Sequence, residues 1–131
     1  MSLKIAVAGA SGRMGRMLID AVEAAPDCTL AGTLDIGRDI DAGLADAQVL
    51  IDFTRPEGTL AHVDACRRLG VNAVIGTTGL NDTQKAEIAA HARHVAVVMA
   101  PNMSVGVHVV MRLLDVAARA LNQGYDIEVI E

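Results

Sequence analysis

The segment 9–15, with the sequence GASGRMG, limits what this chain can fold into more than any other feature. A short apolar run, Leu3–Ala8, precedes it, and apolar residues at helical spacing follow it between Gly12 and Ala25. Glycines between a strand and a helix permit a tight turn and let backbone amides approach a pyrophosphate, which the positive end of the helix dipole also attracts. We therefore expect a phosphate-binding turn here. Glycines that serve only helix–sheet packing are the alternative.

Apolar runs and helical patterns alternate along the rest of the chain. We expect further strands at 28–34, 49–53, 71–75, 95–99 and 126–130, and helices at 57–69, 82–92 and 105–121. Strands that are apolar almost throughout and alternate with helices predict a parallel sheet covered on both faces. The predicted fold is α/β, a doubly wound, three-layer, Rossmann-like dinucleotide-binding domain over 1–131. The helix at 105–121 is nearly all apolar, so we expect it to be buried between layers.

Composition excludes several classes of protein. The 131 residues fit one domain. With 11 Lys and Arg against 16 Asp and Glu, and only 2% aromatic residues, the chain lacks the basic surface and stacking platforms of a nucleic-acid-binding protein. No apolar run approaches the ~18 residues of a membrane span. We expect a cytoplasmic protein without a signal peptide, whose Cys28 and Cys66 are reduced core thiols.

Doubly wound folds bind ligands where their strands end, so the turns after the strands are candidate sites. Asp35 ends the second predicted strand, where a carboxylate can accept hydrogen bonds from the adenosine ribose diol. The same carboxylate repels a 2′-phosphate, which Arg13 and Arg38 can instead pair with. The sequence therefore favours NADH, or use of both cofactors, over strict selectivity for NADPH. The alternative for Arg38 is a solvated loop charge.

Three further turns carry polar groups. The segment 76–79, with the sequence GTTG, has two hydroxyls and a flexible backbone that suit a nicotinamide ribose or amide, although a plain turn before a helix is the alternative. Asn102 offers the donors and acceptors that a carboxamide requires. Ser104 is expected to cap the helix that follows. Arg55 faces either the cofactor or solvent.

Residues for acid–base or nucleophilic chemistry are scarce. The sequence presents no Ser-His-Asp set, paired carboxylates or metal-ligand cluster, and both lysines, Lys4 and Lys85, lie away from the expected site. Three histidines are expected at the surface on or beside outer helices: His62, His91 and His94. His108 lies near the expected site, as a packing or solvent-bridged residue. The residues by themselves indicate a cofactor-binding domain without an evident acid or substrate pocket.

Five motifs together resemble the dihydrodipicolinate reductase family: GASGRMG at 9–15, IDFTRPEGT at 51–59, IGTTG at 75–79, NMSVGV at 102–107 and YDIEVIE at 125–131. The resemblance implies an oxidoreductase that reduces a cyclic imine acid on the diaminopimelate route to lysine, with NADH or NADPH as cofactor. The motifs and the resemblance assign cofactor binding to Gly9, Ala10, Ser11, Gly12, Arg13, Met14, Asp35, Arg38, Phe53, Gly76, Thr77, Thr78, Ala100, Pro101, Asn102 and Met103.

The chain also departs from the family pattern. Ile36 stands where an Arg often follows the acidic residue, the segment 35–47 is short, and His108 stands where an Asn is common. The family's catalytic His-His-Arg-His-Lys run follows the strand that ends at Glu131. We therefore expect the substrate domain, the catalytic lysine and any imine reduction to be absent from this chain, and exposed apolar surface to favour homo-oligomers. The alternative is a stand-alone NAD(P)-binding or redox-sensing module without reductase activity.

Overall fold

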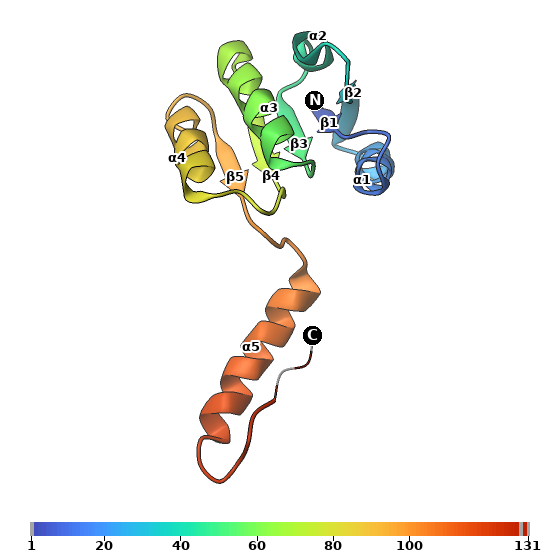
Figure 1. The fold of residues 1–131 in the computed structure, drawn as a ribbon. Helices are drawn as coiled ribbons and strands as arrows, with labels where there is room; N and C mark the ends of the chain where they lie inside the picture. The colour runs from blue at the N-terminus through green and yellow to red at the C-terminus, as the bar shows by residue number, and fades with distance from the viewer. Residues whose placement is uncertain (1, 129, 131) are drawn as a thin grey trace. The chain divides into compact units, whose positions relative to one another are not determined.

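The computed structural model describes residues 2–128 and 130, and the chain divides into two units, Met1–Pro101 and Asn102–Glu131. Nine elements make up the first unit in the order β1 (Leu3–Ala8), α1 (Arg13–Ala24), β2 (Cys28–Leu34), α2 (Ile40–Leu44), β3 (Val49–Asp52), α3 (Pro56–Leu69), β4 (Asn72–Ile75), α4 (Asp82–His91) and β5 (Val97–Met99). The described part of the second unit contains α5 (Val105–Ala120) (Figure 1).

The five strands form one parallel sheet in the order β2-β1-β3-β4-β5, which confirms the predicted α/β fold class. The strand ends are level in this sheet. Ala8 pairs with both Leu34 and Asp52, Asp52 pairs with Ile75, and Ile75 pairs with Met99. The turns that follow all five strands therefore begin at one carboxyl edge, where ligands bind in folds of this class.

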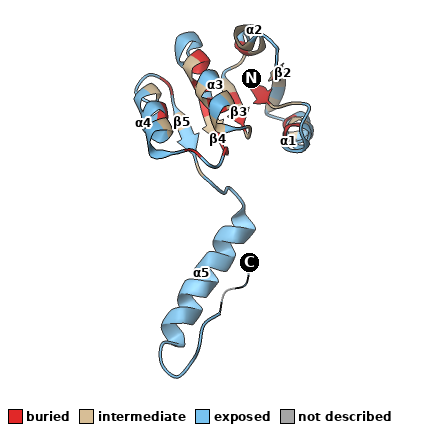
Figure 2. Ribbon diagram, in the orientation of Figure 1, coloured by how far each residue is buried: buried red, intermediate tan, exposed pale blue. Residues whose placement is uncertain are grey.

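Two clusters of apolar residues, one on each face of the sheet, make the unit three layers thick. Along β1, Ala6 and Ala8 belong to the larger cluster, which also contains residues of α3 and α4, whereas Ile5 and Val7 pack with Val22 of α1. Side chains alternate between the two faces of a strand, so β1 serves both clusters. Buried residues accordingly lie along the sheet and on the helix faces turned toward it (Figure 2). Both predicted core cysteines are free thiols, Cys66 buried and Cys28 half-buried.

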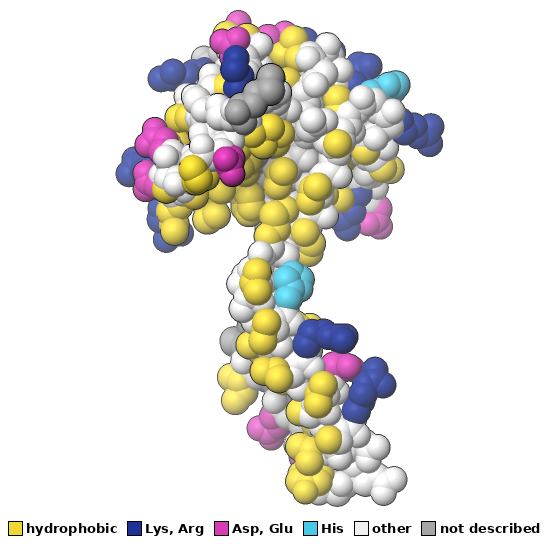
Figure 3. Space-filling model, turned by 180° about the vertical axis from the view of Figure 1, so that it is seen from behind, with side chains coloured by type: hydrophobic (Ala, Val, Ile, Leu, Met, Phe, Trp, Pro, Cys, Tyr) yellow, Lys and Arg dark blue, Asp and Glu magenta, His cyan; other side chains and the backbone are white. Residues whose placement is uncertain are grey.

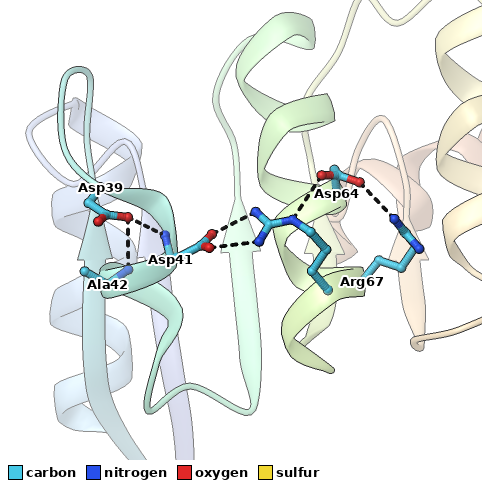
Figure 4. A network of polar contacts seen from close by, with 6 residues as sticks. Asp39, Asp41, Ala42, Asp64 and Arg67 are labelled. Carbon is cyan, nitrogen blue, oxygen red and sulfur yellow. Dashed lines mark hydrogen bonds and ion pairs between the residues drawn. The ribbon is translucent and has the colours of Figure 1, made fainter.

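Helix α2 was not expected from the sequence, because five residues are too few to show a helical period. The Asp39 carboxylate begins it by accepting hydrogen bonds from the backbone amides of Asp41 at 2.9 Å and Ala42 at 3.2 Å. Arg68 of α3 then holds Asp41 through two hydrogen bonds of 2.8 Å and also contacts Asp64 on its own helix (Figure 4). This network ties α2 to α3.

Local signals set three of the helix ends, among them the expected cap at Ser104. Asn81 and Gln84 exchange side-chain-to-backbone hydrogen bonds of 2.9 Å and so begin α4. Gly70 ends α3 in the left-handed conformation, at φ +71°. Ser104 caps α5 by accepting a hydrogen bond from the amide of Val107 at 3.4 Å. These three ends are therefore set by residues next to each helix.

Two expectations for the second unit were wrong. Within its own unit none of the residues of α5 is buried, and hydrophobic side chains run along the helix (Figures 2 and 3). Residues 126–128 and 130 form no strand, and Val129 lies outside the described residues. Apolar composition records what a segment can bury, whereas burial and strand pairing both require a partner surface, which one helix and a short tail do not supply. No helix in the described part of the chain is long and apolar enough to cross a membrane.

Candidate dinucleotide-binding site

The glycine-rich segment forms a tight turn between β1 and α1. Gly9 has φ +68°, a backbone conformation that other residues rarely adopt. The amides of Gly9 and Ala10 both donate to the carbonyl of Leu34, at 2.9 and 3.2 Å, and the Gly12 amide donates to the Gly9 carbonyl at 2.9 Å. These bonds fix the turn against the end of β2.

Helix α1 begins without a side-chain cap. Gly12 stands at its N-cap position, and its first turn contains no acidic residue. Side chains of Asp39, Asn81 and Ser104 cap α2, α4 and α5, whereas α3, like α1, begins without a side-chain cap. The first amides of α1 therefore have no side-chain acceptor from the cap, and they lie at the positive end of the helix dipole. An anion can complete this end of the helix.

Gly15 brings α1 close to the turn. A Cβ atom at this position would lie 2.7 Å from the carbonyl carbon of Gly9 and 2.8 Å from Cα of Ala10, and it would overlap the Gly9 carbonyl oxygen. A side chain would therefore occupy the space in which the turn backbone lies. Only glycine leaves the backbone cradle open, as a close approach to pyrophosphate requires.

Asp35 lies beside this turn. One carboxylate oxygen accepts a hydrogen bond from the Ser11 amide at 2.9 Å, and the other accepts from the Ile36 amide at 3.2 Å. Hydrogen bonds from Ser11, through its hydroxyl and its amide, hold the pKa of Asp35 below its ordinary value, and the charge of Arg38 adds to the effect. Asp35 is therefore ionised at neutral pH, with oxygen lone pairs left for a diol.

Two hollows lie beside the predicted residues. One, of about 480 Å³, is lined by Gly32, Thr33, Arg38, Asp39, Ala42 and Gly43. The other, of about 280 Å³, is lined by Thr77, Thr78, Gly79, Leu80, Lys85, Met99 and Pro101. The second hollow brings together predicted residues from the turns after β4 and β5. It also includes Lys85, which the sequence placed away from the site.

Backbone hydrogen bonds fix the positions of the turns after β3, β4 and β5 relative to one another. The Gly76 amide donates to the Asp52 carbonyl at 2.9 Å, and the Ala100 amide donates to the Ile75 carbonyl at 3.1 Å. The Phe53 ring packs so closely on Gly76 that a Cβ there would overlap it. Arg55, by contrast, is exposed.

The structure corrects the expectation that His62 is a surface residue. Its side chain is only 13% exposed, and Nδ1 lies 2.9 Å from the carboxylate of the fully buried Asp52. Asp52 was not expected to be a functional residue, because it lies within 49–53, a strand that is apolar almost throughout. The signal that was present is a charged residue ending a buried strand, where the side chain must find donors. His94 is exposed, as expected, and His91 is half-buried.

Asn102 and Met103 lie at the start of the second unit and are exposed. The side-chain oxygen of Asn102 accepts a hydrogen bond from the Ser104 amide at 2.8 Å. The backbone carbonyl oxygen of Asn102 lies 3.0 Å from Nε2 of His108. His108 thus contacts backbone within its own unit. The Asn102 amide nitrogen remains available to a ligand.

The parallel sheet, the uncapped first helix and the acidic residue after β2 define a Rossmann-like nucleotide-binding domain. The dihydrodipicolinate reductase from Paenisporosarcina sp. TG-14, solved with dipicolinate bound, has this fold with a TM-score of 0.77 and 24% identity, over 90% of this chain and 54% of that one. The myo-inositol 2-dehydrogenase from Lactobacillus plantarum aligns with a TM-score of 0.69 and 12% identity, over 89% and 42%. At these identities the two structures show the fold alone.

Sequence comparison identifies the family. Residues 3–103 match the family described as dihydrodipicolinate reductase, N-terminus, to which this chain therefore belongs. The 4-hydroxy-tetrahydrodipicolinate reductase of Burkholderia mallei (strain SAVP1) is 55% identical over 152 residues, covering 99% of this chain. The chain spans 57% of that relative's length. The family uses NADH or NADPH, and its N-terminal domain binds the nucleotide.

Proposed function

We propose that this chain is the cofactor-binding part of an NAD(P)H-dependent 4-hydroxy-tetrahydrodipicolinate reductase. The observation that carries the proposal is the open N-terminus of α1, where uncapped amides and the glycine turn form a cradle that a pyrophosphate fits. A bound nicotinamide would supply a hydride to a cyclic imine acid on the route to lysine. The residues of this chain bind and orient that cofactor, and no catalytic residue is assigned among them.

The adenosine half of the cofactor is assigned to Gly9–Met14, Asp35 and Arg38. Asp35 is supported as the ribose ligand because it is ionised and already fixed by the Ser11 amide at 2.9 Å. Its charge opposes a 2′-phosphate, and Ile36 supplies no cation beside it. Arg38 and Arg13 are the cations that offset this repulsion. The proposed preference is therefore for NADH, or for both cofactors.

The nicotinamide half is assigned to the turns after β3, β4 and β5. Phe53 and Gly76 support this edge by packing against each other, and Thr78 and Pro101 border the 280 Å³ hollow. The exposed residue Thr78 and the backbone of Ala100 offer polar contacts at this edge. Asn102 and Met103 belong to the second unit, and their assignment rests on the motif at 102–107, in which the carboxamide of Asn102 can pair with a nicotinamide amide.

Calorimetric titration of the chain with NADH and with NADPH tests the proposal. Saturable binding is expected, with NADH at least as tight as NADPH. Asp35→Ser should weaken NADH at least tenfold and turn the preference toward NADPH, because it removes both the ribose acceptor and the repulsive charge. Arg38→Ala, the matched control, should weaken NADPH and leave NADH within about twofold. If neither NADH nor NADPH binds, the proposal is refuted. If the chain binds NADPH more tightly than NADH, the role of Asp35 in cofactor choice is refuted.

The proposal includes a cytoplasmic location and self-association. The location follows from the assigned biosynthetic reaction, which draws on the dinucleotide pool of the cell. Self-association is supported by the apolar side chains along α5, which are exposed within their own unit, Val105 by 76% and Val116 by 64%. Sedimentation at rising concentration tests it, and a strictly monomeric profile would refute it.

A further inference from the structure

The fully buried carboxylate of Asp52 ends β3, beside the turns to which the cofactor is assigned. One of its oxygens accepts two hydrogen bonds from Thr54, from the amide at 2.8 Å and from the hydroxyl at 2.6 Å. The other oxygen lies 2.9 Å from Nδ1 of His62, which projects from α3. Burying a charge without hydrogen-bond donors costs free energy, and these three hydrogen bonds offset the cost of burying the Asp52 carboxylate.

His62 must donate in this pair. An ionised carboxylate only accepts hydrogen bonds, so the proton is assigned to Nδ1 of the ring, whether the imidazole is neutral or charged. Burial raises the pKa of Asp52, but the hydrogen bonds from His62 and Thr54 outweigh it and hold the pKa below its ordinary value. Asp52 therefore stays anionic and keeps orienting both partners at neutral pH.

Two threonine hydroxyls also connect Asp52 to the turn after β4. The Thr59 hydroxyl donates to the Thr77 hydroxyl at 2.7 Å, and the Thr77 hydroxyl donates to Asp52 at 3.4 Å. Thr59 and Thr77 are both buried. The Thr77 hydroxyl thus faces inward, so the turn offers a ligand its backbone and the exposed Thr78.

The two residues after Asp52 contact the other turns directly. A Cβ atom on Gly9 would lie 3.0 Å from the methyl carbon of Thr54, so Thr54 packs against the phosphate-binding turn. Phe53 packs on Gly76 in the turn after β4. Asp52 therefore fixes a segment that lies between the two halves of the proposed cofactor site.

We propose that Asp52 and His62 form a positioning pair for the dinucleotide: the pair holds Thr54 and Thr77 in place and thereby sets the spacing between the turn at 9–15 and the turn at 76–79. Neither residue contacts the ligand. The inference rests on the proposed function, because it assigns the pair a role in the affinity of that same site. A cofactor that bridges both turns is sensitive to their spacing, whereas the folded state tolerates small shifts.

Matched substitutions at His62 test the pair. His62→Leu removes the donor, whereas His62→Asn keeps an amide nitrogen near the place of Nδ1. The affinity for NADH is measured by calorimetry at a temperature where circular dichroism shows every variant to be folded. His62→Leu should weaken binding at least tenfold, about 1.4 kcal/mol, and His62→Asn should stay within about threefold of the unaltered chain. Ile88→Val, which trims a buried residue of α4, is the control that lowers the melting temperature without changing affinity.

Thr54 provides an independent variant. Thr54→Val removes the hydroxyl bond to Asp52 but retains a methyl group against Gly9, and we expect it to weaken NADH binding at least threefold. Unchanged affinity in both His62→Leu and Thr54→Val would overturn the positioning role, even if both variants melt at lower temperature. A wild-type chain that binds neither NADH nor NADPH would instead refute the proposed function and, with it, this inference. The two failures are thus distinguished by the unaltered chain alone.

Discussion

Replacing Gly15 by Ala tests whether close approach of α1 to the glycine turn shapes the site. The added Cβ would lie 2.7 Å from the Gly9 carbonyl carbon, and an ordinary contact begins at 3.4 Å. The turn or the helix must therefore move by at least about 0.7 Å to free this carbon, and further to free the carbonyl oxygen of Gly9, which the Cβ would overlap. The contacting atoms are backbone, and the bonds from Gly9 and Ala10 to the Leu34 carbonyl resist the movement.

Two opposing contributions set the change in stability. Alanine is favoured over glycine within a helix by roughly 1 kcal/mol. Overpacking against well-fixed neighbours costs about 1–3 kcal/mol, and the backbone contacts at Gly15 place it at the upper end. We expect a net loss of about 2 kcal/mol. For a chain of 131 residues this lowers Tm by roughly 6–10 °C.

The free energy of NADH binding should fall by more than the free energy of unfolding. A shift approaching 1 Å in a positioning group costs on the order of 100-fold, so NADH binding by Gly15→Ala should weaken about that much. Calorimetry at low temperature measures the affinity, and thermal unfolding measures the stability. Gly106→Ala is the matched control, because a Cβ there meets only the Ser104 hydroxyl oxygen at 3.7 Å. Wild-type affinity in Gly15→Ala would refute the reasoning that the backbone cradle binds phosphate.

Three further predictions concern stability. Ile88→Ala empties a buried position in α4 and should cost about 2–5 kcal/mol, measured by urea unfolding; a loss below 1 kcal/mol would mean that the site collapses around the cavity. Asn81→Ala removes the cap of α4 and should cost about 1 kcal/mol in the same assay, whereas Asn81→Asp should cost little. The pKa of Asp52 is lowered in the folded state, so its contribution is complete above the ordinary value of 3.8 and is lost as pH falls through the folded pKa. The free energy of unfolding of wild type should therefore exceed that of His62→Leu at neutral pH, and the difference should shrink as pH falls below 3.8. Urea unfolding at several pH values measures it, and a difference that stays constant with pH would contradict this.

Local signals were sufficient for most of the elements in the first unit. Each of its five strands was expected within two residues of its observed bounds, because near-continuous apolar runs were broken by glycine, proline or polar residues. Helix ends at Asn81 and Gly70 were also predictable, since capping depends on adjacent residues. Helix α2 was not predicted, because its five residues are too few to show a helical period.

The candidate site was predictable only in part. The turn at 9–15 and Asp35 were found because a glycine pattern and a strand-ending carboxylate stand out along the chain. The pairing of Asp52 with His62 was missed, since the two residues come from different elements and meet only when α3 packs on the sheet. Thr77 was identified as a candidate, but its hydroxyl faces Thr59 and Asp52 inside the unit.

The sequence by itself determined the parallel α/β class, the glycine turn at 9–15 and the family, because these depend on periodicity and on short motifs of neighbouring residues. The tertiary structure decided which polar side chains are enclosed and what they contact. It turned His62 from an expected surface residue into a donor to a buried carboxylate. It also left α5 exposed within its own unit, although its composition predicted burial. Burial depends on a complementary surface brought from elsewhere in space, and the pattern of one segment does not contain that surface.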